Sequence, residues 1–240
     1  MSSLAEKATD LGFAAGWRLT RLLPGGMAGT LFNVGGDLAA ARGVRGDGGV
    51  AQLRRNLARA VPQAGKRELD ELTRHAMRSY ARYWREVFQL PAMDPADVAA
   101  RHVVDGSENL DAALAEGNGA MIGMPHTGNW DALALWIVRH YGQFSTVAER
   151  LKPESLYQRF LRFREGLGME LLPLTGGEPV VPQLSARLRD NRIVILLADR
   201  DLARTGVPVT LFGEQTKMPA GPAFLAARTG AALLPLTSWF

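Results

Sequence analysis

The sequence contains no cysteine, which excludes disulfide bonds, thiol catalysis and zinc sites with cysteine ligands. It has no run of 18 or more apolar residues, so we expect no helix that spans a bilayer. The Walker A sequence of nucleotide-binding loops and the G-x-S-x-G turn of serine hydrolases are both missing. The four histidines do not follow the H-E-x-x-H spacing, so the sequence predicts no metal site.

Lysine is scarce although the chain is basic. Lysine and arginine together number 28 against 24 acidic residues, and lysine occurs only at positions 7, 66, 152 and 217. Arginine binds phosphate groups through paired hydrogen bonds, so this bias favours an anionic partner. A genome that favours alanine, glycine and arginine explains the bias equally well. The first ten residues carry no basic cluster and therefore do not resemble a secretory signal.

Residues 1–44 form an apolar N-terminal segment rich in glycine and alanine. The break at Pro24-Gly25-Gly26 predicts two short helices. Small residues, tryptophan and arginine together are typical of helices that lie in a membrane interface. A helical hairpin packed on the core of the protein is the alternative, and the sequence does not decide between them.

Two further helices are expected before residue 90. A basic pattern around Leu53–Val61 predicts the first, and residues 66–89 predict a long second helix. Four arginines recur along the second helix, at positions 74, 78, 82 and 85. This stripe indicates either a solvated face or a contact with anionic lipid headgroups.

From residue 91 onward the pattern alternates between strands and helices, which indicates an α/β fold. We expect a central, mostly parallel β-sheet flanked by helices, in a domain over residues 45–240. The strands are expected near 101–104, 119–125, 144–149, 169–172, 192–198, 208–212 and 232–238, and the helices near 107–116, 129–142, 153–167, 179–190 and 219–229. Because the chain stops just after an apolar strand, we also expect the domain to continue beyond Phe240.

The most informative stretch runs from Ala120 to Asp131. Ala120–Met124 is a short apolar run that predicts a buried strand. His126 follows at its carboxyl end, on the turn into a helix, where open α/β sheets bind their ligands. Asp131 lies five residues later, in the first turn of that helix. A carboxylate at one ring nitrogen of His126 would leave the other nitrogen as a general base, and Asp131 is the nearest candidate.

Charged residues also follow two other strands. Glu149 and Arg150 come directly after the strand expected to end at Ala148. The triplet Asp199-Arg200-Asp201 follows the strand Ile193–Ala198. Since the carboxyl ends of parallel strands meet at one edge of a sheet, we expect these side chains to lie near His126.

These motifs resemble the lysophospholipid acyltransferase superfamily, and within it the branch of the bacterial lipid A acyltransferases. The resemblance rests on the His126-Thr-Gly-Asn-Trp-Asp131 box, Glu149-Arg150, Asp199-Arg200-Asp201 and the apolar strand at Leu234-Pro-Leu236, and it covers roughly residues 50–240. The glycerolipid branch carries a Pro-Glu-Gly-x-x-Arg box where this chain has Asp199-Arg200-Asp201. The departure favours a sugar-bearing acceptor, and the sequence is most similar to enzymes that acylate phosphatidylinositol mannosides.

The resemblance implies transfer of a fatty acyl group, palmitoyl above all, from acyl-CoA to a mannose 6-hydroxyl of phosphatidylinositol mannoside or a similar anionic glycolipid. No cofactor other than the co-substrate acyl-CoA is expected, and no nucleic acid partner. The protein would lie on the cytoplasmic face of the cell membrane.

The resemblance also suggests roles for the candidate residues. His126 would be the general base and Asp131 would orient it, with Asp199 or Glu149 as a second carboxylate. Backbone N–H groups near Gly128 and Asn129 would hold the oxyanion. Arginines and a carboxylate would bind substrate, namely Arg150, Arg164, Arg200 and Asp201, although Arg164 could equally lie on a solvated helix face.

Three alternatives remain open at this point. One is transfer to another glycolipid, another is hydrolysis of acyl-CoA by the same histidine, and the third is a lipid-binding protein without catalysis. Replacement of His126 separates catalysis from binding, and product analysis with an acceptor separates transfer from hydrolysis.

Overall fold

A computed structural model describes residues 4–44, 46–201 and 205–240. Residues 1–3 of the expected N-terminal segment lie outside the described residues, as do residues 45 and 202–204. The chain divides into two compact units. One comprises residues 1–13, 93–210 and 215–240 and contains the β-sheet, and the other comprises residues 14–92 and 211–214 and is helical. The domain boundary at residue 44 stays a prediction.

The sheet unit is built on five parallel strands in the order β3-β2-β4-β1-β7. The strands are β1 (Ala120–Met124), β2 (Ser145–Ala148), β3 (Glu170–Pro173), β4 (Ile193–Leu197) and β7 (Ala232–Pro235). A separate hairpin is formed by β5 (Val207–Leu211) and β6 (Glu214–Met218). The α/β fold with a mostly parallel sheet is therefore confirmed.

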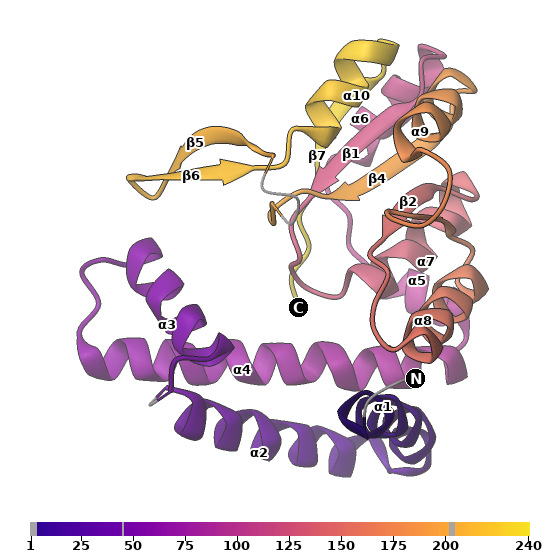
Figure 1. The fold of residues 1–240 in the computed structure, drawn as a ribbon. Coiled ribbons are helices and arrows are strands. Elements are labelled where there is room, and N and C mark those ends of the chain that lie inside the picture. Colours follow the sequence, from indigo (N-terminus) through magenta and orange to yellow (C-terminus); the bar gives the residue numbers. More distant parts are fainter. Residues whose placement is uncertain (1–3, 45, 202–204) are drawn as a thin grey trace. The chain divides into compact units, whose positions relative to one another are not determined.

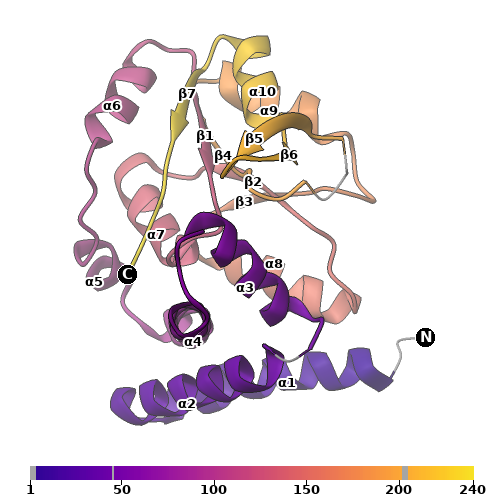
Figure 2. The same cartoon turned by 90° about the vertical axis from the view of Figure 1, so that its left-hand side faces the viewer.

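Helices cover both faces of the sheet (Figures 1 and 2). The helices of the sheet unit from residue 93 onward are α5 (Pro95–Ala100), α6 (Ser107–Ala115), α7 (Trp130–Tyr141), α8 (Glu154–Gly166), α9 (Val180–Arg189) and α10 (Gly221–Thr229). On one face, Met121 and Val194 pack with Leu188 of α9 and Leu225 of α10 in a buried apolar cluster. Neighbouring residues of a strand point to opposite faces, and Ala120, Ile122 and Met124 of β1 are also buried. This two-sided burial explains why β1 and β4 are apolar throughout.

The central pairing of β1 sets the geometry of the carboxyl edge. β1 pairs with β4 from Ala120↔Ile193 to Met124↔Leu197, so the two strands end at the same level. On its other side β1 pairs with β7, with Gly123 opposite Pro235. The segments that follow β1, β4 and β7 therefore leave the sheet side by side.

One sequence expectation about the sheet unit is wrong, and the elements α5 and β6 were not expected. Residues 101–104 form no strand, and Val103 is 91% exposed. The helix α5 ends just before them, where Asp94 caps its first turn by accepting a hydrogen bond from the Ala96 N–H. Strand β6 was not expected, because its residues up to Lys217 are polar and exposed on both faces and show no alternation of apolar residues.

The helical unit contains part of α1 (Leu4–Leu22) together with α2 (Gly25–Gly43), α3 (Gly49–Ala60), α4 (Lys66–Gln89) and the short 3₁₀ turn η1 (Leu90–Ala92). Its helices are joined by ion pairs between Arg54 and Asp70 and between Arg78 and Asp37. The arginine stripe of α4 is thus partly used within the unit, since Arg82 also pairs with Glu86. None of the described helices is long and apolar enough to cross a membrane.

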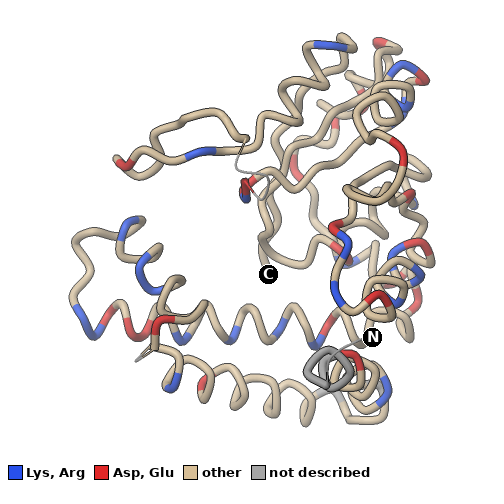
Figure 3. Tube along the Cα trace, viewed as in Figure 1, with Lys and Arg blue, Asp and Glu red and all other residues tan. Residues whose placement is uncertain are grey.

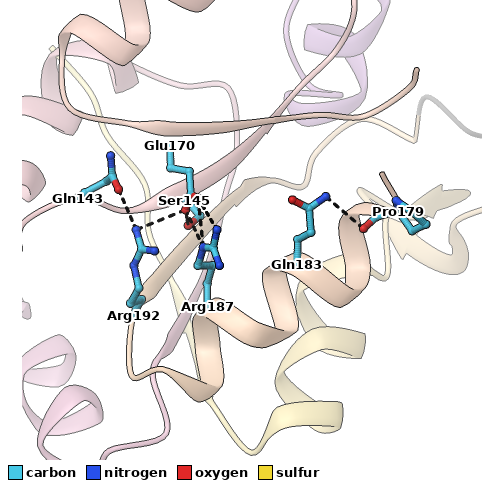
Figure 4. A network of polar contacts seen from close by, with 7 residues as sticks. All are labelled: Gln143, Ser145, Glu170, Pro179, Gln183, Arg187 and Arg192. Carbon is cyan, nitrogen blue, oxygen red and sulfur yellow. Dashed lines mark hydrogen bonds and ion pairs between the residues drawn. The ribbon is translucent and has the colours of Figure 1, made fainter. Parts of the chain in front are cut away.

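An ionic network ties together the amino edge of the sheet (Figure 4). The Glu170 carboxylate at the start of β3 accepts hydrogen bonds from Arg187 of α9 and from the Ser145 hydroxyl at the start of β2. Arg192, just before β4, lies 3.3 Å from the same carboxylate and also donates to Gln143. Hydrogen bonds from Arg187 lower the pKa of Glu170 from its ordinary value of 4.5 to about 2, against the opposing effect of burial and with further help from Ser145 and Arg192.

We expect Glu170→Gln to lower the free energy of unfolding at pH 7 by about 1 to 2 kcal/mol, since the Glu170 side chain is 21% exposed and solvent screens part of the interaction. The folded-state pKa is the lower one, so the charged network stabilises the fold above about pH 4.5 and loses this effect as the pH falls toward 2. Urea unfolding of the wild type and of Glu170→Gln should therefore give free energies of unfolding whose difference becomes smaller as the pH is lowered.

Glu178→Gln is the matched control, because Glu178 is exposed. This variant should unfold like the wild type at each pH. If the free energies of unfolding of Glu170→Gln and wild type differed by the same amount from pH 7 down to acidic pH, the proposed link between stability and the lowered pKa of Glu170 would be contradicted.

Candidate active site

His126 and Asp199 form a hydrogen-bonded pair at the carboxyl edge of the sheet. His126 lies two residues beyond the end of β1 and Asp199 two residues beyond the end of β4. The backbone N–H of Ala198 donates to the Met124 carbonyl, which extends the pairing of the two strands toward the site. The His126 Nδ1 and Asp199 Oδ1 atoms are 2.7 Å apart. Both side chains remain accessible, with 39% of His126 and 32% of Asp199 exposed.

The pKa of Asp199 fixes which imidazole nitrogen carries the proton. Burial alone would raise this pKa, but the hydrogen bond and charge of His126 and two backbone donors outweigh it and hold the pKa below its ordinary value of 3.8. Asp199 is therefore ionised at neutral pH and can only accept a hydrogen bond. Nδ1 of His126 must then be the donor, which leaves Nε2 of a neutral ring with a free lone pair.

Asp131 has a different partner from the one expected. It lies in the first turn of α7, is fully buried, and pairs at 2.9 Å with the Nε of Arg164 from α8. The Arg164 guanidinium also lies over the ring of Trp130, 4.2 Å from its centroid. The Nδ1 of His126 donates its hydrogen bond to Asp199 and not to Asp131, so an orienting role of Asp131 stays a prediction. Asp131 points into the α7–α8 contact because that is where the buried guanidinium lies.

Two alternatives were considered for Arg164, namely binding of substrate and a position on a solvated helix face. Its side chain is 17% exposed, so it does not lie on a solvated helix face. Its Nε donates a hydrogen bond to Asp131, and its guanidinium lies over the ring of Trp130. Arg164 holds α8 against the start of α7, and its role as a phosphate ligand stays a prediction.

The turn after His126 leads directly into a helix N-terminus. Gly128 has a left-handed backbone with φ +57°, and Asn129 caps α7 by accepting a hydrogen bond from the Ala132 N–H. The N–H groups of a first helical turn point away from the helix and make its start electropositive. Gly128 and Asn129 thus lie beside the electropositive start of α7, and their role in holding an oxyanion stays a prediction.

The charged residues after β2 lie one strand further along the same edge. Glu149 and Arg150 are both exposed, and Arg150 donates to Glu154 of α8 at 2.9 Å. Of the two carboxylates considered as second partner of the histidine, the structure brings Asp199 to the ring and gives Glu149 no such contact in the described residues.

The last two expected residues follow Asp199. Arg200 is exposed. Asp201 accepts a hydrogen bond from the Gly206 N–H at 2.9 Å, and its carboxylate lies against the Cα of Gly206. Asp201 therefore stabilises the approach to β5, and its binding of substrate stays a prediction.

Sequence reasoning missed a cluster of hydroxyl groups beside His126. Thr127, Thr237 and Ser238 are joined by hydrogen bonds across the ends of β1 and β7. Hydroxyl residues after a strand are common in loops. Their significance depends on β7 lying beside β1, which no local pattern reveals.

Comparison with known proteins identifies the class to which this site belongs. The family model described as bacterial lipid A biosynthesis acyltransferase matches residues 3–240. The chain belongs to this family and is an acyltransferase.

Curated relatives narrow the comparison. The chain is 53% identical to a phosphatidylinositol mannoside acyltransferase of Mycolicibacterium smegmatis over 238 residues, which cover 99% of this chain and 77% of the relative. It is 52% identical to a protein of the same name from Mycobacterium tuberculosis over 242 residues, which cover 100% of this chain and 75% of the relative. The resemblance inferred from the sequence motifs is confirmed.

The two aspartates should differ in their effect on stability. We expect Asp131→Asn to lower the free energy of unfolding by about 2 to 4 kcal/mol, because it leaves the Arg164 charge without its buried counterion. Asp199→Asn should cost about 1 kcal/mol or less, because its side chain is partly solvated. Urea unfolding at pH 7 measures both, and the reverse order would contradict the assignment of the two carboxylates.

Proposed function

We propose that the protein transfers a fatty acyl group, palmitoyl above all, from acyl-CoA to a mannose 6-hydroxyl of phosphatidylinositol mannoside. The observation that carries the mechanism is the hydrogen bond between His126 Nδ1 and an ionised Asp199, which leaves Nε2 as a base at an accessible sheet edge. The identity of the acceptor is supported by the two relatives, both named for this substrate.

In this proposal the acceptor hydroxyl attacks the thioester carbonyl directly. Nε2 of His126 removes the hydroxyl proton as the new C–O bond forms, and Asp199 stabilises the resulting imidazolium. The tetrahedral oxyanion is held by backbone N–H groups at the start of α7, near Gly128 and Asn129. Its collapse breaks the C–S bond, and the imidazolium returns the proton to the CoA thiolate. No acyl-enzyme forms, in keeping with a chain that has no cysteine and no serine elbow.

Arginines at the same edge are the candidates for binding the anionic parts of both substrates. Arg150 and Arg200 are exposed at the ends of β2 and β4, and a guanidinium can bind a phosphate through two hydrogen bonds. We assign them to the phosphates of CoA or of the phosphoinositol headgroup.

The apolar face of α2 supports a second part of the proposal, that the protein lies on the cytoplasmic face of the cell membrane. Met27, Leu31, Val34 and Leu38 are each 49–61% exposed and recur at spacings of four and three residues, so they share one face of the helix. The charged residues of α2 are Asp37, which pairs with Arg78, and Arg42 at its end. Figure 3 shows α2 as an almost uncharged helix within a unit whose α3 and α4 are rich in cations. An apolar face near basic residues suits an anionic lipid surface.

The reaction is tested by thiol release from palmitoyl-CoA, with and without phosphatidylinositol mannoside. We expect release to be stimulated by the acceptor and to yield an acylated glycolipid. His126→Ala should lower this release by about 100-fold or more, because it removes the general base. His140→Ala, at the exposed end of α7, is the control and should retain wild-type rates.

Each alternative has its own outcome in this assay. A rate of thiol release that is the same with and without phosphatidylinositol mannoside would favour hydrolysis of acyl-CoA. Wild-type protein that binds the glycolipid without any thiol release would favour the non-catalytic lipid-binding protein, and equal rates for His126→Ala and wild type would contradict the role of His126.

The membrane contact is tested by co-sedimentation with vesicles of phosphatidylcholine and phosphatidylglycerol. We expect Leu31→Asp combined with Val34→Asp to reduce binding about tenfold or more, since charged residues cannot enter the apolar layer. Val103→Asp is the matched control, because Val103 is an exposed apolar side chain of the sheet unit. Equal binding of the wild type and the α2 variant would exclude this face as the contact.

A further inference from the structure

The backbone of the catalytic turn is held by the segment that follows β7. Leu236 N–H donates to the Gly123 carbonyl at 3.0 Å, one residue beyond the last paired position of β7. The regular ladder cannot continue past this point, because Pro125 has no N–H to donate. β1 turns away here, and the Thr127 N–H donates to the Pro125 carbonyl at 2.9 Å.

Beyond the point where the backbone hydrogen bonds between β1 and β7 end, Ser238 makes two hydrogen bonds to Thr127. Its hydroxyl donates to the Thr127 carbonyl at 2.6 Å, and its backbone N–H donates to the Thr127 hydroxyl at 3.4 Å. The Thr127 and Thr237 hydroxyls lie 3.2 Å apart and add a third contact. The residue directly after His126 is thus fixed at both its carbonyl and its side chain.

Ser238 also packs against Gly128, the residue that follows Thr127. A Cβ atom on Gly128 would lie 2.6 Å from the Ser238 hydroxyl oxygen and 2.7 Å from the Ser238 carbonyl carbon. Only glycine allows this approach, and its left-handed φ of +57° also favours glycine. Two residues in succession after His126 are therefore packed against Ser238.

We propose that Ser238 is a positioning residue that fixes the backbone of the turn after His126, so that the imidazole meets Asp199 and its Nε2 faces the acceptor hydroxyl. Asp199 holds the ring from the side of β4, and Ser238 holds the backbone from the side of β7. This inference rests on the proposed function for its effect on turnover. The position of the ring itself does not depend on the identity of the substrate.

Three variants of the full-length protein test the inference. Ser238→Ala removes the hydroxyl bond, whereas Ser238→Thr keeps a hydroxyl at the same atom. Thr229→Val is the matched control, because the Thr229 hydroxyl makes a similar bond to the Leu225 carbonyl, before the start of β7 and away from His126. We expect Ser238→Ala to lower kcat about tenfold or more, with KM for palmitoyl-CoA changed less than about twofold, because a small displacement of a base slows the chemical step. Ser238→Thr and Thr229→Val should stay within about threefold of wild type.

The second readout needs no substrate. The Nδ1 proton of His126, hydrogen-bonded to Asp199, should give a downfield resonance in ¹⁵N-labelled protein, assigned by its loss in His126→Gln. We expect this resonance to broaden through solvent exchange in Ser238→Ala and to persist in Ser238→Thr and Thr229→Val. If wild type shows no acyl transfer, the proposed function fails, and the resonance alone still decides the role of Ser238.

Two results would overturn the inference. One is an unchanged His126 resonance in Ser238→Ala, whatever happens to kcat. The other is an equal loss of kcat and resonance in Thr229→Val, which would mean that any lost hydrogen bond in this region loosens the fold.

Discussion

The parallel pairing of β1 with β4 is the constraint on which the site depends. Because the two strands end in register, the residues two positions beyond each end, His126 and Asp199, leave the sheet at the same level. Their side chains then meet at 2.7 Å although 73 positions separate them in the chain. A shift of one residue in this register would reverse the faces of the strand and move the two side chains apart. The apolar layers on both sides of the sheet hold the register, since β1 and β4 are buried on both faces.

The two edges of the sheet use charge in different ways. At the amino edge, Glu170 is surrounded by Arg187 and Arg192, so its charge is neutralised and the strands are held together. At the carboxyl edge, Asp199 accepts a hydrogen bond from the His126 ring, and both side chains remain accessible. The ion pair between Arg164 and the buried Asp131 holds α8 against the start of α7. The ion pairs thus join strands and helices to one another, whereas the His126–Asp199 pair is accessible at the carboxyl edge.

Much of the fold and part of the site could be predicted from the sequence. The five parallel strands and the helices from α6 to α10 follow from local apolar patterns, whereas the short helix α5 was not predicted. The place of His126 follows from the strand that precedes it. The partner of His126 could not be predicted, because Asp131 and Asp199 both satisfy the pattern of a carboxylate near a histidine. The choice depends on Arg164, which draws Asp131 into the buried contact between α7 and α8. Ser238 was missed for a similar reason, since only the position of β7 beside β1 brings it to Thr127.

Asp199 is expected to affect the reaction through the hydrogen bond that it accepts from His126. A double-mutant cycle on kcat/KM for acyl transfer tests it most directly, with Asp199→Asn made in the wild type and in a His126→Gln background. We expect Asp199→Asn to lower kcat/KM strongly in the wild type and to have almost no further effect once His126 is replaced. Full additivity of the two substitutions would contradict it, because independent effects would mean that the hydrogen bond between the two side chains has no part in the reaction.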